Sequence, residues 1–113
     1  MHEYSIVQAL LERVQAEVDA RNATAVHGLR VKIGELSGVE IDLLQSAYEL
    51  FSERSICDGA KLEIVPVAAR WTCPNCERTM RRGEILRCPD CSLPAQLIEG
   101  SEIVLDRLEM EVA

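Results

Sequence analysis

Four cysteines form the most distinctive pattern of the sequence. They stand in two Cys-x-x-Cys pairs, Cys73 with Cys76 and Cys88 with Cys91, and eleven residues separate the pairs. Each pair of this spacing forms a tight turn that directs two sulfur atoms at one point, and a short connection brings the two turns together. Four thiolates in a tetrahedron suit Zn²⁺, which imposes no geometry of its own and accepts soft sulfur ligands. The spacing therefore predicts a closed, structural Zn²⁺ site.

Other uses of the same cysteines stay open at this point. A single Cys-x-x-Cys pair is typical of a redox dithiol, and two disulfides could also use these four residues. The doubled pattern favours zinc over both, whereas the ligand types alone leave iron as an alternative metal. The fifth cysteine, Cys57, has no partner at this spacing. We expect it to be a small buried apolar residue.

The first residues carry a second set of metal-ligand groups. His2 is too large for efficient removal of Met1, so we expect a mature chain with a free Met1 amine. That amine, the backbone nitrogen of His2 and the imidazole can chelate one metal ion in fused rings. Nitrogen donors in a plane suit Ni²⁺ or Cu²⁺. The alternative is a solvated, frayed terminus, which is the common state of chain ends.

Two helices are expected to support these groups. Apolar residues with a helical period predict a first helix over about 4–20 and a second that starts at about 37–40 and ends at 52–55. Ser37 and Glu40 match the Ser-x-x-Glu capping box, which predicts that they begin the second helix. The other histidine, His27, opens an expected strand and has no ligand type at metal-binding spacing, so we expect it to bind no metal.

Three strands complete the expected domain. Alternating apolar residues predict strands over 26–33, 61–65 and 102–110. Pro66 lacks an N–H donor and indicates the exit of a strand or an edge strand. The apolar phase of the last strand changes near Asp106 and Arg107, which indicates a β-bulge or burial on both faces. Between the second and third strands, a strand at Arg70–Thr72 and a short return strand before Cys88 are expected.

This order of elements predicts an α+β fold. Two helices pack on a small three-stranded mixed sheet, and a zinc-ribbon-like lobe with four cysteines is inserted before the last strand. The expected boundaries are residues 1–67 plus 101–113 for the α+β domain and residues 68–100 for the inserted lobe. A unit as small as the lobe needs a metal to stabilise it.

The composition and the absence of several motifs argue against some classes of protein. The chain has 113 residues, 48% of them apolar, and a formal net charge of −7, which disfavours binding to nucleic acid. No segment resembles a membrane span or a secretory signal, and the implied thiolates suggest the cytoplasm. No Ser-His-Asp set, P-loop or paired carboxylates occur, and the His-x-Glu element of a zinc deaminase is missing. We therefore expect no catalysis.

Three segments in this order resemble the HypA/HybF family of nickel metallochaperones, which act in the maturation of [NiFe]-hydrogenase. The segments are Met1-His2-Glu3-Tyr4-Ser5, Lys32-Ile33-Gly34-Glu35-Leu36-Ser37 and the two Cys-Pro-x-Cys pairs. The resemblance implies a nickel site on His2 with the Met1 amine, to which Glu3 adds its backbone nitrogen, its carboxylate or both. It also makes Glu40 a candidate nickel ligand, although some relatives have the shorter Asp there. In this family the four cysteines hold zinc.

The resemblance also implies partners. Family members work with a nickel-handling GTPase and deliver Ni²⁺ to the precursor of the hydrogenase large subunit. Some relatives also serve urease, which adds urease maturation proteins as expected partners, and some dimerise, so the chain is expected to be a monomer or a homodimer. No nucleic acid and no membrane partner is expected. The competing interpretation is a zinc-ribbon module that binds protein or nucleic acid, and such binding to nucleic acid would weaken with salt.

Overall fold

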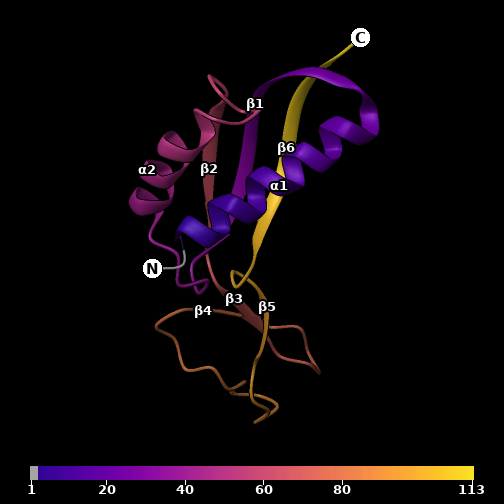
Figure 1. Cartoon of the computed structure of the whole chain (residues 1–113). Coiled ribbons are helices and arrows are strands. Elements are labelled where there is room, and N and C mark those ends of the chain that lie inside the picture. The colour runs from indigo at the N-terminus through magenta and orange to yellow at the C-terminus, as the bar shows by residue number, and fades with distance from the viewer. Residues whose placement is uncertain (1–2) are drawn as a thin grey trace.

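The computed structural model describes residues 3–113. Along the chain the elements are α1 (Glu3–Arg21), β1 (Ala23–Gly34), α2 (Ile41–Ser52), β2 (Lys61–Val67), β3 (Arg70–Thr72), β4 (Thr79–Arg81), β5 (Gln96–Glu99) and β6 (Ile103–Val112). The molecule is elongated, with extents of 56 × 29 × 17 Å (Figure 1). Its radius of gyration is 17.8 Å, whereas a compact chain of this length would have about 13 Å.

Among residues 3–113, no helix combines the length and the apolar character that a membrane-spanning helix needs.

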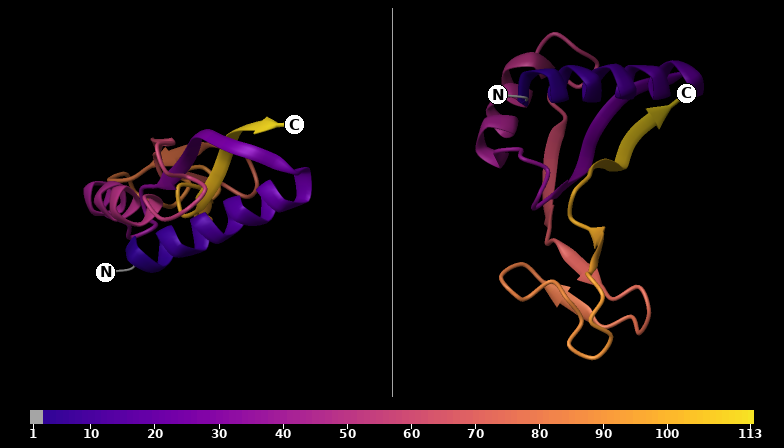
Figure 2. Two further views of the ribbon diagram at one scale, coloured as in Figure 1. Left: turned by 45° about the horizontal axis from the view of Figure 1, so that its top comes forward. Right: turned by 90° about the horizontal axis from the view of Figure 1, so that it is seen from below.

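The larger of two sheets has the strand order β2-β1-β6. β1 is parallel to β2 and antiparallel to β6, so the sheet is mixed. Both helices cover one face of it (Figures 1 and 2). The predicted α+β fold, with two helices on a three-stranded mixed sheet, is confirmed. Pro66 lies in β2, an edge strand, where its missing N–H costs no sheet hydrogen bond.

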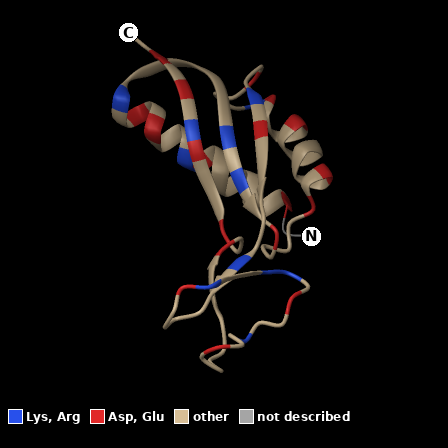
Figure 3. Cartoon of the chain, turned by 180° about the vertical axis from the view of Figure 1, so that it is seen from behind, with Lys and Arg blue, Asp and Glu red and all other residues tan. Residues whose placement is uncertain are grey.

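The main hydrophobic core lies between the helices and this sheet. Each helix has a buried apolar stripe, as the helical period predicts; α1 packs on β1 and β6, and α2 packs on β2 and against α1. The most deeply buried core side chains are Val7, Val14, Val31, Leu44 and Cys57. Charged residues occur along β1, β2 and β6 (Figure 3), and in β1 they alternate with the buried residues. They pair across strands, for example Arg30 with Glu63 at 2.9 Å.

A β-bulge in β6 explains the change of apolar phase in the sequence. Arg30 pairs with Arg107 and the next residue of β1, Val31, pairs with Leu105, so Asp106 is the extra residue. Leu105 and Leu108 therefore both pack against the core although they lie three positions apart. The predicted bulge is confirmed.

Two local predictions are wrong. Glu40 is the N-cap of α2 and its side chain makes no capping hydrogen bond, whereas a capping box would place it at the third helical position. Ser37 instead accepts a hydrogen bond from the Val39 N–H at 3.3 Å, within a turn before the helix. The return strand before Cys88 is also absent, because the partners of β3 are β4 and β5 and only an isolated bridge joins Arg87 to Pro94.

Residues 68–100, here called the cysteine lobe, lie at one end of the long axis (Figure 2). The lobe holds the second sheet, of order β4-β3-β5. Its buried cluster consists only of Cys73, Met80 and Cys88, with Trp71 packed against it. Two of those three residues are cysteines, so the lobe has almost no hydrophobic core of its own.

Candidate metal centre

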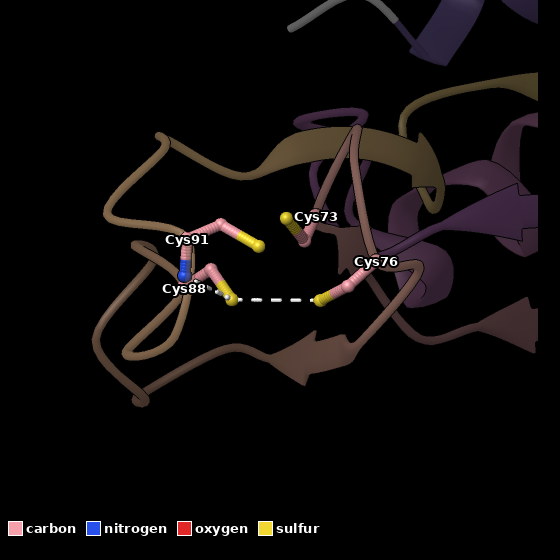
Figure 4. A group of neighbouring side chains, drawn as sticks. All are labelled: Cys73, Cys76, Cys88 and Cys91. Atoms are coloured by element: carbon pink, nitrogen blue, oxygen red, sulfur yellow. Dashed lines mark hydrogen bonds between the residues drawn. The ribbon is translucent and has the colours of Figure 1, made fainter.

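Two turns of the cysteine lobe bring the four sulfur atoms together. The Sγ atoms of Cys73, Cys76, Cys88 and Cys91 all lie within 4.8 Å of one another, and Figure 4 shows the two pairs facing each other from opposite sides. The Sγ atoms of Cys76 and Cys88 are 3.6 Å apart. A tetrahedral zinc with Zn–S bonds of about 2.3 Å requires sulfur atoms about 3.8 Å apart, whereas a disulfide requires about 2.05 Å. The donor set therefore fits a metal ion.

The two turns are built alike. The residue after the second cysteine of each pair, Glu77 or Ser92, has a left-handed backbone, with φ of 65° and 57°. Its N–H donates to the carbonyl of the first cysteine, at 3.0 Å to Cys73 and 2.9 Å to Cys88. These bonds close each turn and direct both of its side chains inward. The cysteine spacing thus determines the local geometry without help from the rest of the fold.

Backbone N–H groups support the sulfur atoms. The Asn75 N–H lies 3.5 Å from the Cys73 Sγ, and the Cys91 N–H lies 3.4 Å from the Cys88 Sγ. The backbone N–H groups of Cys76 and Asn75 lower the pKa of Cys73 to about 7. A thiolate, which is the form that binds a metal, is therefore favoured at this position.

One side chain connects the two turns. The Asn75 Nδ2 donates to the Cys91 Sγ at 3.3 Å, from the first pair to the second. Asp90 occupies the equivalent place in the second pair, but its carboxylate makes no contact with a cysteine. Its nearest charged partner is Arg78, whose Nη1 lies 4.0 Å from the Asp90 Oδ2. This asymmetry singles out Asn75 as the side chain that supports the Cys91 sulfur atom.

We expect Asn75→Ala to release zinc to a chelator about tenfold faster than the parent, since losing an outer-shell partner typically weakens a site by about 10- to 100-fold. The measurement is the rate of zinc transfer to a coloured chelator from fully loaded protein. Asp90→Ala is the matched control and should release zinc at the parental rate. Equal rates for Asn75→Ala and the parent would show that this hydrogen bond does not hold the metal.

The candidate nickel residues are placed only in part. Met1 and His2 lie outside the described residues. Glu3 begins α1 and is only 3% exposed. The backbone N–H of Glu40 donates to the Glu3 Oε2 at 3.2 Å, so the structure brings together two candidates that are 37 residues apart. Neither belongs to the cysteine cluster, which is the one ligand group found among residues 3–113.

The other two residues considered from the sequence are His27 and Cys57, and both make contacts unrelated to a metal cluster. The His27 Nε2 lies 3.2 Å from the Glu111 Oε1 on the exposed face of the sheet, and no metal-ligand cluster among the described residues includes it. Cys57 is fully buried beside α2, and burial raises the pKa of its thiol. The predicted burial of Cys57 is confirmed, and the absence of a metal at His27 stays a prediction.

Sequence reasoning missed one residue, Glu35. It lay in an apparent break between a strand and a helix, but its carboxylate contacts the cysteine lobe at two points, the Ala69 N–H and the Arg82 guanidinium. The one available signal was its position in the Lys32–Ser37 segment that carries the family resemblance.

Comparisons with known proteins agree with this geometry. Residues 1–110 match the family described as "Hydrogenase/urease nickel incorporation, metallochaperone, hypA". The chain is 40% identical to the hydrogenase maturation factor HypA of Shewanella oneidensis, over all of this chain and 98% of that protein. It is 39% identical to HypA of Campylobacter jejuni, over 98% and 100% of the two chains. The solution structure of the Ni metallochaperone HypA from Helicobacter pylori superposes with a TM-score of 0.75 at 30% identity, over the full length of both chains.

Proposed function

Because the chain belongs to the HypA family of metallochaperones for nickel incorporation into hydrogenase and urease, we propose that it carries Ni²⁺ at its N-terminal end. His2 and the Met1 amine are the principal ligands in this proposal, and Glu3 adds its backbone nitrogen, its carboxylate or both. The family consists of maturation factors, and catalysis by this chain is not part of the proposal.

The observation that carries the proposal is the anchoring of Glu3. This carboxylate is buried and accepts a hydrogen bond from the backbone N–H of Glu40, the N-cap of α2. A buried carboxylate at the start of α1 is costly unless it is paired, so its position is well determined. It also interacts favourably with the positive end of the α1 dipole. The proposed ligands Met1 and His2 therefore directly precede a fixed point of the fold, and Glu40, whose backbone bonds to Glu3, is a further candidate.

The cysteine lobe has a different role in the proposal. Residues 68–100 form a zinc-binding domain, in which Cys73, Cys76, Cys88 and Cys91 hold one structural Zn²⁺. Residues 1–67 plus 101–113 form the nickel-binding domain. Four sulfur ligands leave no open position, so zinc stays bound while nickel is exchanged. A nickel site with few protein ligands, in contrast, is open to ligand exchange with a partner protein.

The proposed partners are the proteins that delivery of Ni²⁺ requires. A nickel-handling GTPase assists release, and the recipient is the hydrogenase large-subunit precursor or, through urease maturation proteins, urease. The net charge of −7 argues against nucleic acid as a partner. Four cysteines that must remain reduced to bind zinc favour the cytoplasm.

The test is a Ni²⁺ titration of the native chain, of His2→Ala and of a chain with extra residues ahead of Met1. Both altered forms should lose more than the roughly 10- to 100-fold in affinity that removal of an outer-shell partner costs, because each removes a direct ligand. Absorption of planar Ni²⁺ and calorimetry measure the loss, and the zinc content should not change. His27→Ala is the matched control. If the extended chain or His2→Ala bound nickel as tightly as the parent, the proposed site would be wrong.

A further inference from the structure

The loop that follows β1 joins the cysteine lobe to the main sheet. The Glu35 N–H donates to the Val67 carbonyl at 2.8 Å, where the chain enters the lobe, and the Leu36 N–H donates to the Gly100 carbonyl at 2.7 Å, where it leaves. One short loop thus bonds to both connections of the lobe, here called the junction.

The backbones at the junction are in close contact. A Cβ added at Gly34 would lie 2.3 Å from the Gly100 carbonyl oxygen, and one added at Gly100 would lie 2.4 Å from the Ala69 Cα. No side chain fits between these segments, so glycine is required at both positions. The close approach leaves few orientations in which the lobe can meet the sheet.

The Glu35 carboxylate adds two contacts across the junction. Its Oε1 accepts from the buried Ala69 N–H at 2.8 Å and its Oε2 accepts from the Arg82 Nη1 at 3.2 Å. The Ala69 N–H, and then Arg82, keep the pKa of Glu35 below its usual value. The Arg82 side chain is 63% exposed, so that ion pair alone would be weak. The carboxylate therefore acts mainly by satisfying a buried backbone donor at the lobe entrance.

The same loop reaches the start of α1. Residues 36–39 separate Glu35 from Glu40, and Val39 packs against the main core. The Glu40 N–H then donates to the Glu3 carboxylate at 3.2 Å. A single short segment therefore contacts the cysteine lobe at one end and Glu3, one of the proposed nickel ligands, at the other.

We propose that Glu35 is a positioning residue, whose carboxylate sets the orientation of the cysteine lobe on the main sheet and, through residues 36–40, the placement of Glu3. The first half of this proposal stands on the contacts alone. The second half, that the orientation affects nickel binding, rests on the proposed function.

The test compares zinc-loaded Glu35→Ala and Glu35→Gln with the parent. The matched control is Glu99→Ala, which removes a carboxylate that pairs with Arg70 at 2.9 Å inside the lobe. In the parent and in Glu99→Ala, one alignment tensor should fit the residual dipolar couplings of both the main sheet and the cysteine lobe. In Glu35→Ala, the main sheet and the lobe should each need a tensor of their own. Glu35→Gln keeps an acceptor for Ala69 and should fall between them. Zinc content and thermal unfolding verify that each variant is folded.

Nickel titration of the same proteins tests the second half. Glu35→Ala should weaken Ni²⁺ binding by about 2- to 30-fold, the range of coupling through a packed network, and Glu99→Ala should not. A single tensor for Glu35→Ala would overturn the positioning role. Two tensors with unchanged nickel affinity would overturn the link to Glu3. Failure of the proposed function is recognised separately, because His2→Ala would then bind nickel like the parent while the tensors still report on Glu35.

Discussion

Removal of the proposed zinc ion with a chelator is expected to unfold residues 68–100 and to leave the main sheet folded. The buried cluster of the lobe is Cys73, Met80 and Cys88, and units below about 40 residues rarely fold without a metal or disulfides. Structural zinc supplies about 10–16 kcal/mol in small domains, far more than three buried side chains can provide. Cys88→Ser, which replaces a buried cysteine of the cluster, should have the same effect.

Trp71 makes this result easy to measure. It is the single tryptophan of the sequence and it packs on the cysteine cluster, so its fluorescence reports on the lobe. The helical circular dichroism signal reports on α1 and α2. Cys57→Ala is the matched control, because Cys57 is just as buried but lies in the main core, and it should retain zinc. If Trp71 kept its native emission after chelation, the lobe would be stable without metal and this account would be wrong.

Gly100→Ala is expected to be the most damaging small substitution at the junction. Its φ is +100° and the new Cβ would lie 2.4 Å from the Ala69 Cα, a backbone atom that cannot rotate away. The unfavourable φ costs about 1–3 kcal/mol and the overpacking about 1–3 kcal/mol more, so we expect a loss of roughly 2–6 kcal/mol in the free energy of unfolding.

Gly83→Ala separates these two causes. Gly83 has a similar φ of +95° but nothing lies within 4 Å of an added Cβ. It should show only the backbone cost of about 1–3 kcal/mol. Denaturant unfolding of both zinc-loaded variants, monitored by Trp71 emission, gives the difference. Equal losses for the two variants would mean that the close approach at Gly100 does not constrain the junction.

Local patterns predict the elements of this fold well. The apolar period identifies α1 and α2, and the phase change near Asp106 identifies the bulge, because each depends on residues that are close in sequence. The cysteine cluster is predictable for the same reason, since each turn is closed by its own backbone. The capping box fails because Ser37 is used in a turn of its own and Glu40 itself becomes the N-cap.

The polar contacts that join the parts are not predictable in this way. Glu35 meets Ala69 and Arg82 at separations of 34 and 47 residues, and Glu3 meets the Glu40 backbone at 37. No period in the sequence records such pairs, because they depend on how the strands are ordered and where the chain leaves the sheet. These are also the contacts on which the proposed link between the two metal sites depends.

The position of β6 has a consequence for biosynthesis. Of the described strands it is made last, yet it pairs with β1, the first of them. The nascent chain therefore leaves the edge of β1 that pairs with β6 exposed during translation of the cysteine lobe. The edge stays exposed until the two ends of the lobe have come together. Loop closure costs less entropy when the intervening segment is already compact. Binding of the proposed zinc ion by the emerging cysteines would thus hasten completion of the sheet, and without it the chain would keep an open, aggregation-prone strand for longer.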